Sequence, residues 1–201
     1  MSVGEPAATA AVAARGLRRS WAVRVPTVAV ITAAIGVLLV WAYRAFGPQS
    51  VWFAFAVVWL PMVGLGIVNR FAQPRLPRSF HQLRRFERSG RVYELVGVRI
   101  AKRLLRRGLL ATFNPDLHLP SEPDAARIAY VDQRMRDAEA SHAILFVLTL
   151  GVVIDAIAHG WLATASATLL FDVLMNGYPV MLQRYNRGRL ARRYPNLPLG
   201  T

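Results

Sequence analysis

The chain contains no cysteine, a single lysine and few acidic residues. The absence of cysteine excludes a disulfide, a thiolate metal site and a thiol nucleophile. Its 201 residues include 25 Lys and Arg against 11 Asp and Glu, which gives a net charge of +14, and Lys102 is the only lysine. No serine nucleophile motif is evident either, so the sequence offers no evident group for a covalent enzyme intermediate.

Several catalytic motifs are also missing. The chain has no Gly-x-Ser-x-Gly elbow, no phosphate-binding Gly-rich loop and no His-x4-Asp acyltransferase box. Glu139 and His142 form one Glu-x-x-His element, whereas a di-iron site requires two copies and two further carboxylates. The other histidines, His81, His118 and His159, have no ligand spacing. We therefore predict no metal and no bound cofactor.

Apolar residues make up 54% of the sequence, and they are segregated from the charged ones. Four apolar segments approach or reach the length of about 20 helical residues that spans a bilayer. They cover residues 25–43, 51–68, 143–158 and 161–182. Short turns at 46–50 and 159–160 join them in pairs. This pattern predicts an all-α integral membrane protein with four transmembrane helices in two hairpins.

The cationic residues gather on one side of these spans. Residues 1–24 carry four arginines and one acid, residues 70–141 fifteen Arg or Lys and eight acids, and residues 184–201 five arginines and no acid. The opposite ends offer only Arg44. The positive-inside bias therefore predicts an inner-membrane protein with both termini and the central segment in the cytoplasm.

The segments outside the spans differ in character. The Ala-rich residues 1–24 are predicted to be a disordered basic N-terminus, residues 25–193 one membrane domain, and 194–201 a tail. Within the cytoplasmic segment 70–141, apolar residues recur at helical spacing among arginines from Val92 to Arg107. This is typical of interfacial helices whose arginines contact anionic phospholipid headgroups, and it argues against a nucleic-acid partner. No helix breaker separates the helix that begins near residue 121 from the third span.

Polar residues of the second hairpin are predicted to meet at one depth. Counting back from the turn at 159–160, His142 lies about 17 residues away, or roughly 26 Å at 1.5 Å per residue. The same distance forward reaches Asn176, and Asp132 similarly comes level with Arg187. An antiparallel helix pair would thus bring these side chains together to within about one turn.

His142 is the side chain best suited to take a proton near neutral pH. Glu139, one turn earlier on the same face, is expected to accept a hydrogen bond from the other ring nitrogen. The alternative is an interfacial histidine beside a solvated glutamate. Asn176 is expected to orient a hydroxyl or bind a carbonyl oxygen, and its alternative is an interhelical hydrogen bond.

The arginines after the fourth span admit two interpretations. They form an ordinary membrane-anchoring cluster, which suits Arg192 and Arg193 best, or they have a specific role, in which they either bind the phosphates of coenzyme A or pair with Glu139 and Asp132. Headgroup anchoring alone does not explain the asparagine at Asn186.

Several elements of the sequence combine into a known pattern. They are Tyr93-Glu94 with Gly97-Val98 and Lys102, Glu139-x-x-His142, Asn176-x-x-Pro179, and Tyr185-Asn186-Arg187-x-Arg189. From about residue 51 to 193 the chain resembles the glycosyl-4,4'-diaponeurosporenoate acyltransferases, small integral-membrane enzymes that acylate a sugar hydroxyl of a carotenoid glycoside. The resemblance implies acyl transfer from acyl-CoA or a similar thioester to a membrane lipid or glycolipid.

This reaction suggests roles for the candidate residues. His142 would be the general base, and Asn176 or Asn186 with Arg187 would stabilise the oxyanion. The expected substrate-binding residues are Tyr93, Glu94, Lys102, Arg184, Tyr185 and Arg189, of which Arg184 and Arg189 would hold donor phosphates. The alternatives are a non-catalytic scaffold that binds anionic lipid and another small membrane transferase, such as a lipid methyltransferase.

Overall fold

The computed structural model describes residues 5–69, 76–105, 125–197 and 199, and all regular elements in these ranges are helical. In chain order they are α1 (Glu5–Phe46), α2 (Val51–Val68), α3 (Arg78–His81), α4 (Arg85–Arg88), α5 (Arg91–Leu95), α6 (Val98–Leu105), α7 (Ala125–Ala158), α8 (Leu162–Asp172), the π-helix η3 (Val173–Gly177) and α9 (Tyr178–Arg193). The predicted all-α fold is confirmed.

Four helical runs are long and apolar enough to cross a membrane, which indicates a membrane protein. They are Arg24–Phe46, Val51–Val68, Ala125–Ala158 and Leu162–Arg193. The last two have 34 and 32 residues, more than the about 20 that a bilayer requires. Both are therefore longer than a single crossing requires. Helix α7 is unbroken, as predicted from the lack of a helix breaker before the third apolar segment.

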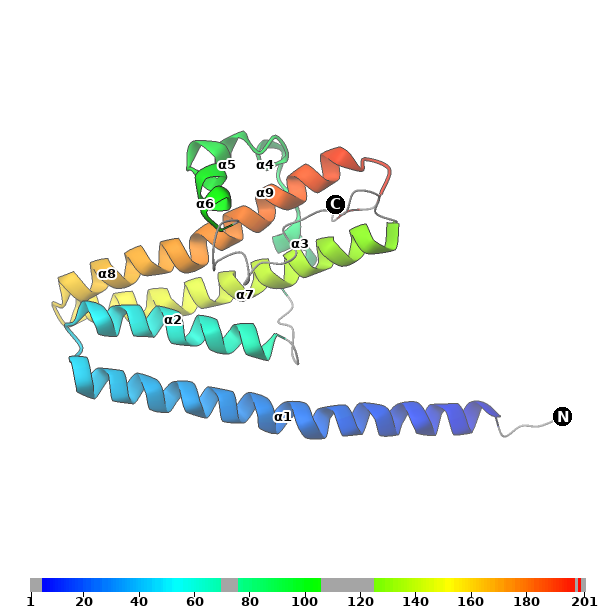
Figure 1. The fold of residues 1–201 in the computed structure, drawn as a ribbon, viewed down its shortest axis with the longest axis horizontal. Coiled ribbons are helices and arrows are strands. Elements are labelled where there is room, and N and C mark those ends of the chain that lie inside the picture. Colours follow the sequence, from blue (N-terminus) through cyan, green and yellow to red (C-terminus); the bar gives the residue numbers. More distant parts are fainter. Residues whose placement is uncertain (1–4, 70–75, 106–124, 198, 200–201) are drawn as a thin grey trace.

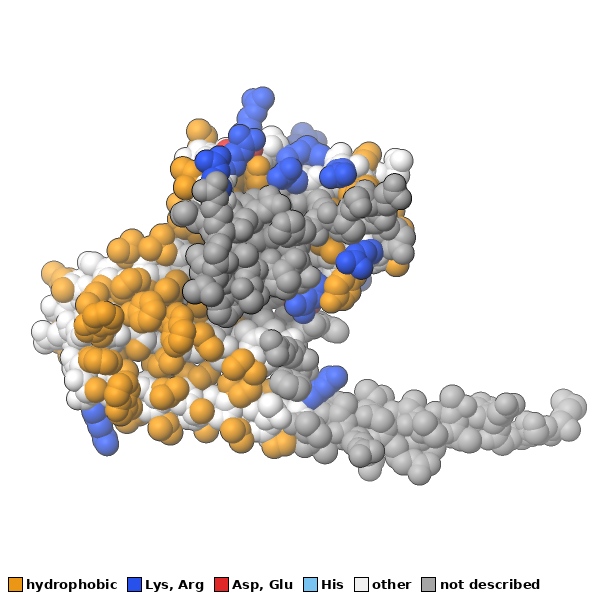
Figure 2. Space-filling model, viewed as in Figure 1, with side chains coloured by type: hydrophobic (Ala, Val, Ile, Leu, Met, Phe, Trp, Pro, Cys, Tyr) orange, Lys and Arg blue, Asp and Glu red, His pale blue; other side chains and the backbone are white. Residues whose placement is uncertain are grey.

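The long helices run antiparallel to their chain neighbours (Figure 1). Helix α1 packs on α2, α2 packs on α7 and α8, and α7 packs along α8 and α9. The two tight turns lie at the same end of the molecule, where the Thr164 hydroxyl donates to the Pro48 carbonyl oxygen over 3.1 Å. Hydrophobic side chains gather around this end, and arginines gather around α4–α6 and α9 (Figure 2).

Helix α1 begins at Glu5, within the N-terminal segment for which disorder is predicted. Alanine is the strongest helix former, and the Ala-rich sequence after Glu5 allows the first span to extend toward the N-terminus. An Ala-rich composition therefore favours a helix as well as disorder.

The basic amphipathic segment is divided into two helices, α5 and α6. Gly97 adopts φ of 79° and separates α5 from α6. A left-handed residue of this kind ends a helix, and glycine adopts it without steric cost. The helix start predicted near residue 121 lies outside the described residues.

The fourth apolar run is not a single α-helix. It changes to a π-helix over Val173–Gly177 and returns to α at Tyr178. Pro179 has no N–H to donate to the carbonyl oxygen four residues earlier, at Met175, so a regular α-helical ladder cannot continue there. A wider π turn accommodates the missing hydrogen bond and buries Asn176.

Helix α9 is the central support of the polar end of the molecule. On one side Leu182 and Tyr185 pack with Tyr93 and Val98 of α5 and α6. On another side Leu190 packs with residues of α7, namely Ile128, Val131 and Met135. The short helices α4–α6 are thus attached to α7 through α9.

We expect Gly90→Ala to weaken the packing of α4 and α5 on α9. Gly90 has φ of 74°, and an added Cβ would lie 2.9 Å from Cε2 of Tyr185. The left-handed backbone alone costs an alanine about 1–2 kcal/mol. Thermal unfolding in detergent measures the effect. Gly66→Ala is the control, because no described atom lies within 4 Å of its added Cβ, and an equal loss in both variants would contradict the expectation.

Candidate active site

A chain of three hydrogen-bonded polar side chains lies between α7 and the fourth helical run. His142 Nδ1 of α7 is 3.0 Å from Asn176 Oδ1 of η3. The Asn176 amide nitrogen donates to Asp172 Oδ1 at the end of α8, over 2.7 Å. Asn176 and Asp172 are fully buried, and His142 is half-buried. We call these residues the polar chain. The predicted common depth of His142 and Asn176 is confirmed.

Burial makes the polar chain costly unless its hydrogen bonds are made. An amide or carboxyl group taken out of water without a partner destabilises the fold by several kcal/mol, on the order of 2–7 for an amide. Asp172 and Asn176 lie four residues apart along a helix, so their side chains face the same side. Between them they place one amide oxygen in front of the imidazole of His142.

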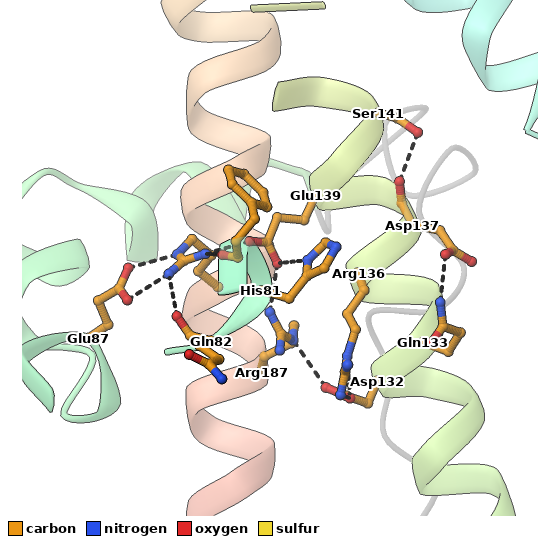
Figure 3. A network of polar contacts seen from close by, with 12 residues as sticks. His81, Gln82, Glu87, Asp132, Gln133, Arg136, Asp137, Glu139, Ser141 and Arg187 are labelled. Atoms are coloured by element: carbon orange, nitrogen blue, oxygen red, sulfur yellow. Dashed lines mark hydrogen bonds and ion pairs between the residues drawn. The ribbon is translucent and has the colours of Figure 1, made fainter. Parts of the chain in front are cut away.

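Glu139 has different partners from the one predicted. It is 0% exposed and accepts hydrogen bonds from Arg184 Nη1 at 2.5 Å and Arg187 Nη1 at 2.7 Å. His81 Nδ1 lies 3.4 Å from Glu139 Oε2 (Figure 3). The expected hydrogen bond between Glu139 and His142 is therefore wrong. Two guanidinium groups are stronger partners for a carboxylate than one neutral imidazole.

Arg187 joins α9 to two positions of α7. Its Nε donates to Asp132 Oδ1 over 3.1 Å, and its Nη1 donates to Glu139. Asp132 also accepts from Arg136 at 2.9 and 2.7 Å. The predicted pairing of Asp132 and Glu139 with an arginine of α9 is confirmed. Arg187 is 2% exposed, and these contacts make it a connector between helices.

Arg184 connects α9 to the short helices as well as to α7. Its guanidinium donates to Glu87 twice, each time over 2.7 Å, and to Glu139. The remaining acceptors are the backbone carbonyl oxygens of Phe80 and Gln82 and the hydroxyl of Tyr93. All five N–H groups of an arginine are thus used. In this conformation Arg184 has no N–H left for a donor phosphate.

Glu87 is the anchor of the short helices, and sequence reasoning did not identify it as part of the site. Burial raises the pKa of Glu87, but hydrogen bonds from Arg184, Tyr93 and the Arg84 N–H outweigh burial and bring it to about 2. Burial and the neighbouring Glu87 carboxylate raise the pKa of Tyr93, whose hydroxyl donates to Glu87. Glu87 therefore stays ionised at neutral pH. The ion-pair cluster is defined here as Glu87, Asp132, Arg136, Glu139, Arg184 and Arg187.

The other expected substrate-binding residues lie on α9 and on the short helices α5 and α6. The Tyr185 hydroxyl donates to Glu94 Oε1 over 3.0 Å, and Glu94 also pairs with Arg99. The exposed Arg189 guanidinium lies 5.9 Å from the centre of the Tyr185 ring. Lys102 belongs to α6, but its side chain is outside the described residues.

Asn186 and Arg187 do not lie beside His142. Asn186 follows Asn176 by ten residues of the same helical run, which corresponds to about 15 Å along the axis. The structure therefore brings His142 together with Asn176, and it brings Glu139 together with Arg184 and Arg187, but it separates these two groups along the helices. Asp172 was missed as a partner, although an acidic residue in an apolar span is itself a signal.

The fold and these groups define a helical membrane protein with buried polar residues on its long central helices. A sequence model of the family described as glycosyl-4,4'-diaponeurosporenoate acyltransferase matches residues 77–195. The chain therefore belongs to this family, and the family name indicates an acyltransferase. The match runs from α3 to α9 and includes the polar chain and the ion-pair cluster. No curated protein and no solved structure matches the chain.

We expect Arg187→Met to destabilise the protein by about 3–5 kcal/mol, since removing one member of a buried ion pair leaves its partner uncompensated. Glu139 and Asp132 would each lose a donor. The measurement is thermal or denaturant-induced unfolding in detergent. Arg189→Met is the matched control, because Arg189 is exposed and exposed charges contribute at most about 1 kcal/mol. Similar losses in the two variants would show that the cluster does not hold α7 to α9.

Proposed function

We propose that this protein moves a fatty acyl group from an acyl thioester, such as acyl-CoA, to a hydroxyl of a membrane lipid or glycolipid. A carotenoid glycoside is the acceptor class that the family name favours. The observation that carries the proposal is the contact of 3.0 Å between His142 Nδ1 and Asn176 Oδ1. Because this contact occupies Nδ1, the second ring nitrogen, Nε2, is the one proposed to act on the acceptor hydroxyl.

The proposed reaction needs no covalent enzyme intermediate. His142 Nε2 takes the proton of the acceptor hydroxyl while the oxygen attacks the thioester carbonyl carbon. The tetrahedral intermediate then expels the thiolate as the C–S bond breaks. The thiolate takes the proton from the imidazolium, which regenerates neutral His142. Direct attack suits a chain without cysteine.

The proposed membrane arrangement has two transmembrane hairpins, both termini in the cytoplasm, and α3–α6 at the cytoplasmic boundary. The charge bias of the sequence supports this orientation. The exposed side chains of α5 and α6 support an interfacial position with anionic lipid as the partner. Leu95 is 88% exposed and Ile100 64%, and the exposed arginines Arg91, Arg99 and Arg103 lie on the same two helices.

We expect His142→Ala to lower acyl transfer by at least about 10²-fold, the lower end of what a positioned base contributes. Purified protein in lipid nanodiscs is incubated with labelled palmitoyl-CoA and a carotenoid glycoside, and the acylated product is measured. His159→Ala is the matched control, because His159 follows the other end of α7 and is exposed.

Retention of activity in His142→Ala would overturn the assignment of the base. Absence of acyl transfer by the wild type, with label transferred instead from a methyl donor, would favour a lipid methyltransferase. Transfer of neither group, with retained binding of anionic lipid, would favour a scaffold.

The interfacial position of α5 and α6 gives a separate expectation. The chain has no cysteine, so Leu95→Cys provides a single labelling position for an environment-sensitive fluorophore. Its emission should shift to the blue when the protein moves from detergent-free amphipol into vesicles containing phosphatidylglycerol. Gln133→Cys on the polar part of α7 is the control, since Gln133 is exposed. Identical emission at Leu95→Cys in both media would contradict the arrangement.

A further inference from the structure

The amide of Asn176 can face His142 in two ways, and only one of them suits a general base. If the amide oxygen faces the ring, His142 must carry its proton on Nδ1, and Nε2 keeps a free lone pair. If the amide nitrogen faces the ring, Nδ1 must be the acceptor and Nε2 carries the proton. A neutral imidazole has one donor and one acceptor nitrogen, so the amide orientation selects the tautomer.

The neighbour on the other side of Asn176 decides between the two orientations. Asp172 Oδ1 lies 2.7 Å from the amide nitrogen. When Oδ1 carries no proton, as in the ionised carboxylate or with the proton on Oδ2, it can only accept a hydrogen bond; a proton on Oδ1 would instead fit the reversed amide. With the amide reversed and Oδ1 unprotonated, two acceptor oxygens would face each other at that distance, inside a region where both residues are 0% exposed.

We propose that Asp172 is a positioning residue, which fixes the amide of Asn176 and thereby holds the proton of His142 on Nδ1. This proposal rests on the function proposed for His142, because it explains how Nε2 is kept unprotonated and ready to take a hydroxyl proton. Asp172 touches neither the ring nor the substrate in this scheme. It acts through Asn176, and Asn176 acts on the ring.

The position of Asp172 in the fold supports a role beyond packing. A carboxyl group in an apolar span is expensive, and such groups tend to mark functional positions. Asp172 is the last residue of α8 and lies directly before the π turn that contains Asn176. The spacing of four residues directs both side chains to the same side of the helix, where α7 presents His142.

Two substitutions at position 172 separate the positioning role from a structural one. Asp172→Asn keeps an acceptor oxygen for the Asn176 amide and should retain kcat. Asp172→Leu has similar size but no acceptor, and it should lower kcat by at least tenfold, out of the about 10²–10⁴-fold that a positioned base contributes, with KM unchanged. Asp155→Leu, at an exposed position of α7, is the matched control and should behave as the wild type.

The tautomer itself is measured by NMR of isotope-labelled histidine in the same nanodiscs, with the His142 signal assigned by its loss in His142→Ala. The wild type and Asp172→Asn should show the proton on Nδ1, and Asp172→Leu should shift it toward Nε2. A wild-type ring protonated on Nε2 overturns the proposal, and this result does not depend on whether any position-172 variant folds.

Other outcomes of these experiments would also contradict the proposed role of Asp172 or the proposed function. If both position-172 variants lose activity while the tautomer stays on Nδ1, Asp172 has a structural role and the proposal is wrong. If Asp172→Leu retains kcat and tautomer, it is wrong as well. If His142→Ala remains fully active, the proposed function fails, whereas the NMR measurement still tests the link from Asp172 to the ring.

Discussion

The pairing of Glu139 with Arg184 and Arg187 is the constraint on which the polar end of this protein depends. Glu139 is completely buried, and a buried carboxylate requires hydrogen-bond partners, of which charged ones are the strongest. Both partners come from α9, so the requirement fixes how α9 lies along α7. Arg187 also reaches Asp132, which precedes Glu139 by seven residues, or two helical turns on the same face.

This fixed register has a consequence farther along the same two helices. His142 follows Glu139 by three residues, and Asn176 precedes Arg184 by eight. A slip of one helix by a turn, about 5.4 Å, would break the ion pairs and would also move Asn176 away from the imidazole. The cluster therefore contributes to the proposed chemistry through alignment, without a charged side chain of the cluster touching His142. The π turn lies between α8 and α9 and contains Asn176. Its geometry therefore determines the final position of the Asn176 side chain relative to His142.

Residue counting along an antiparallel helix pair predicted the long-range neighbours that depend only on helix geometry. His142 with Asn176 and Asp132 with Arg187 follow from equal distances to the turn. The spacing of three residues along α7 suggested His142 as a partner of Glu139 within the same helix, but Glu139 instead accepts hydrogen bonds from Arg184 and Arg187 of α9. Glu87 was not predicted at all. Its contact with Arg184 joins residues 97 apart in sequence, and no periodicity links the short helices to α9.

The sequence is rich in arginine, yet the proposed site carries no excess positive charge, because its arginines are matched by carboxylates. Within the ion-pair cluster three arginines face three carboxylates, so the cluster is close to neutral. The polar chain contains no cation unless His142 is protonated. The excess positive charge of the sequence must then reside elsewhere, and the exposed arginines of α5, α6 and α9 carry part of it. A cation beside His142 would disfavour the imidazolium that forms when the base takes a proton. Neutralised arginines near the site and exposed arginines at the surface are therefore compatible with both proton transfer at His142 and attraction of an anionic membrane.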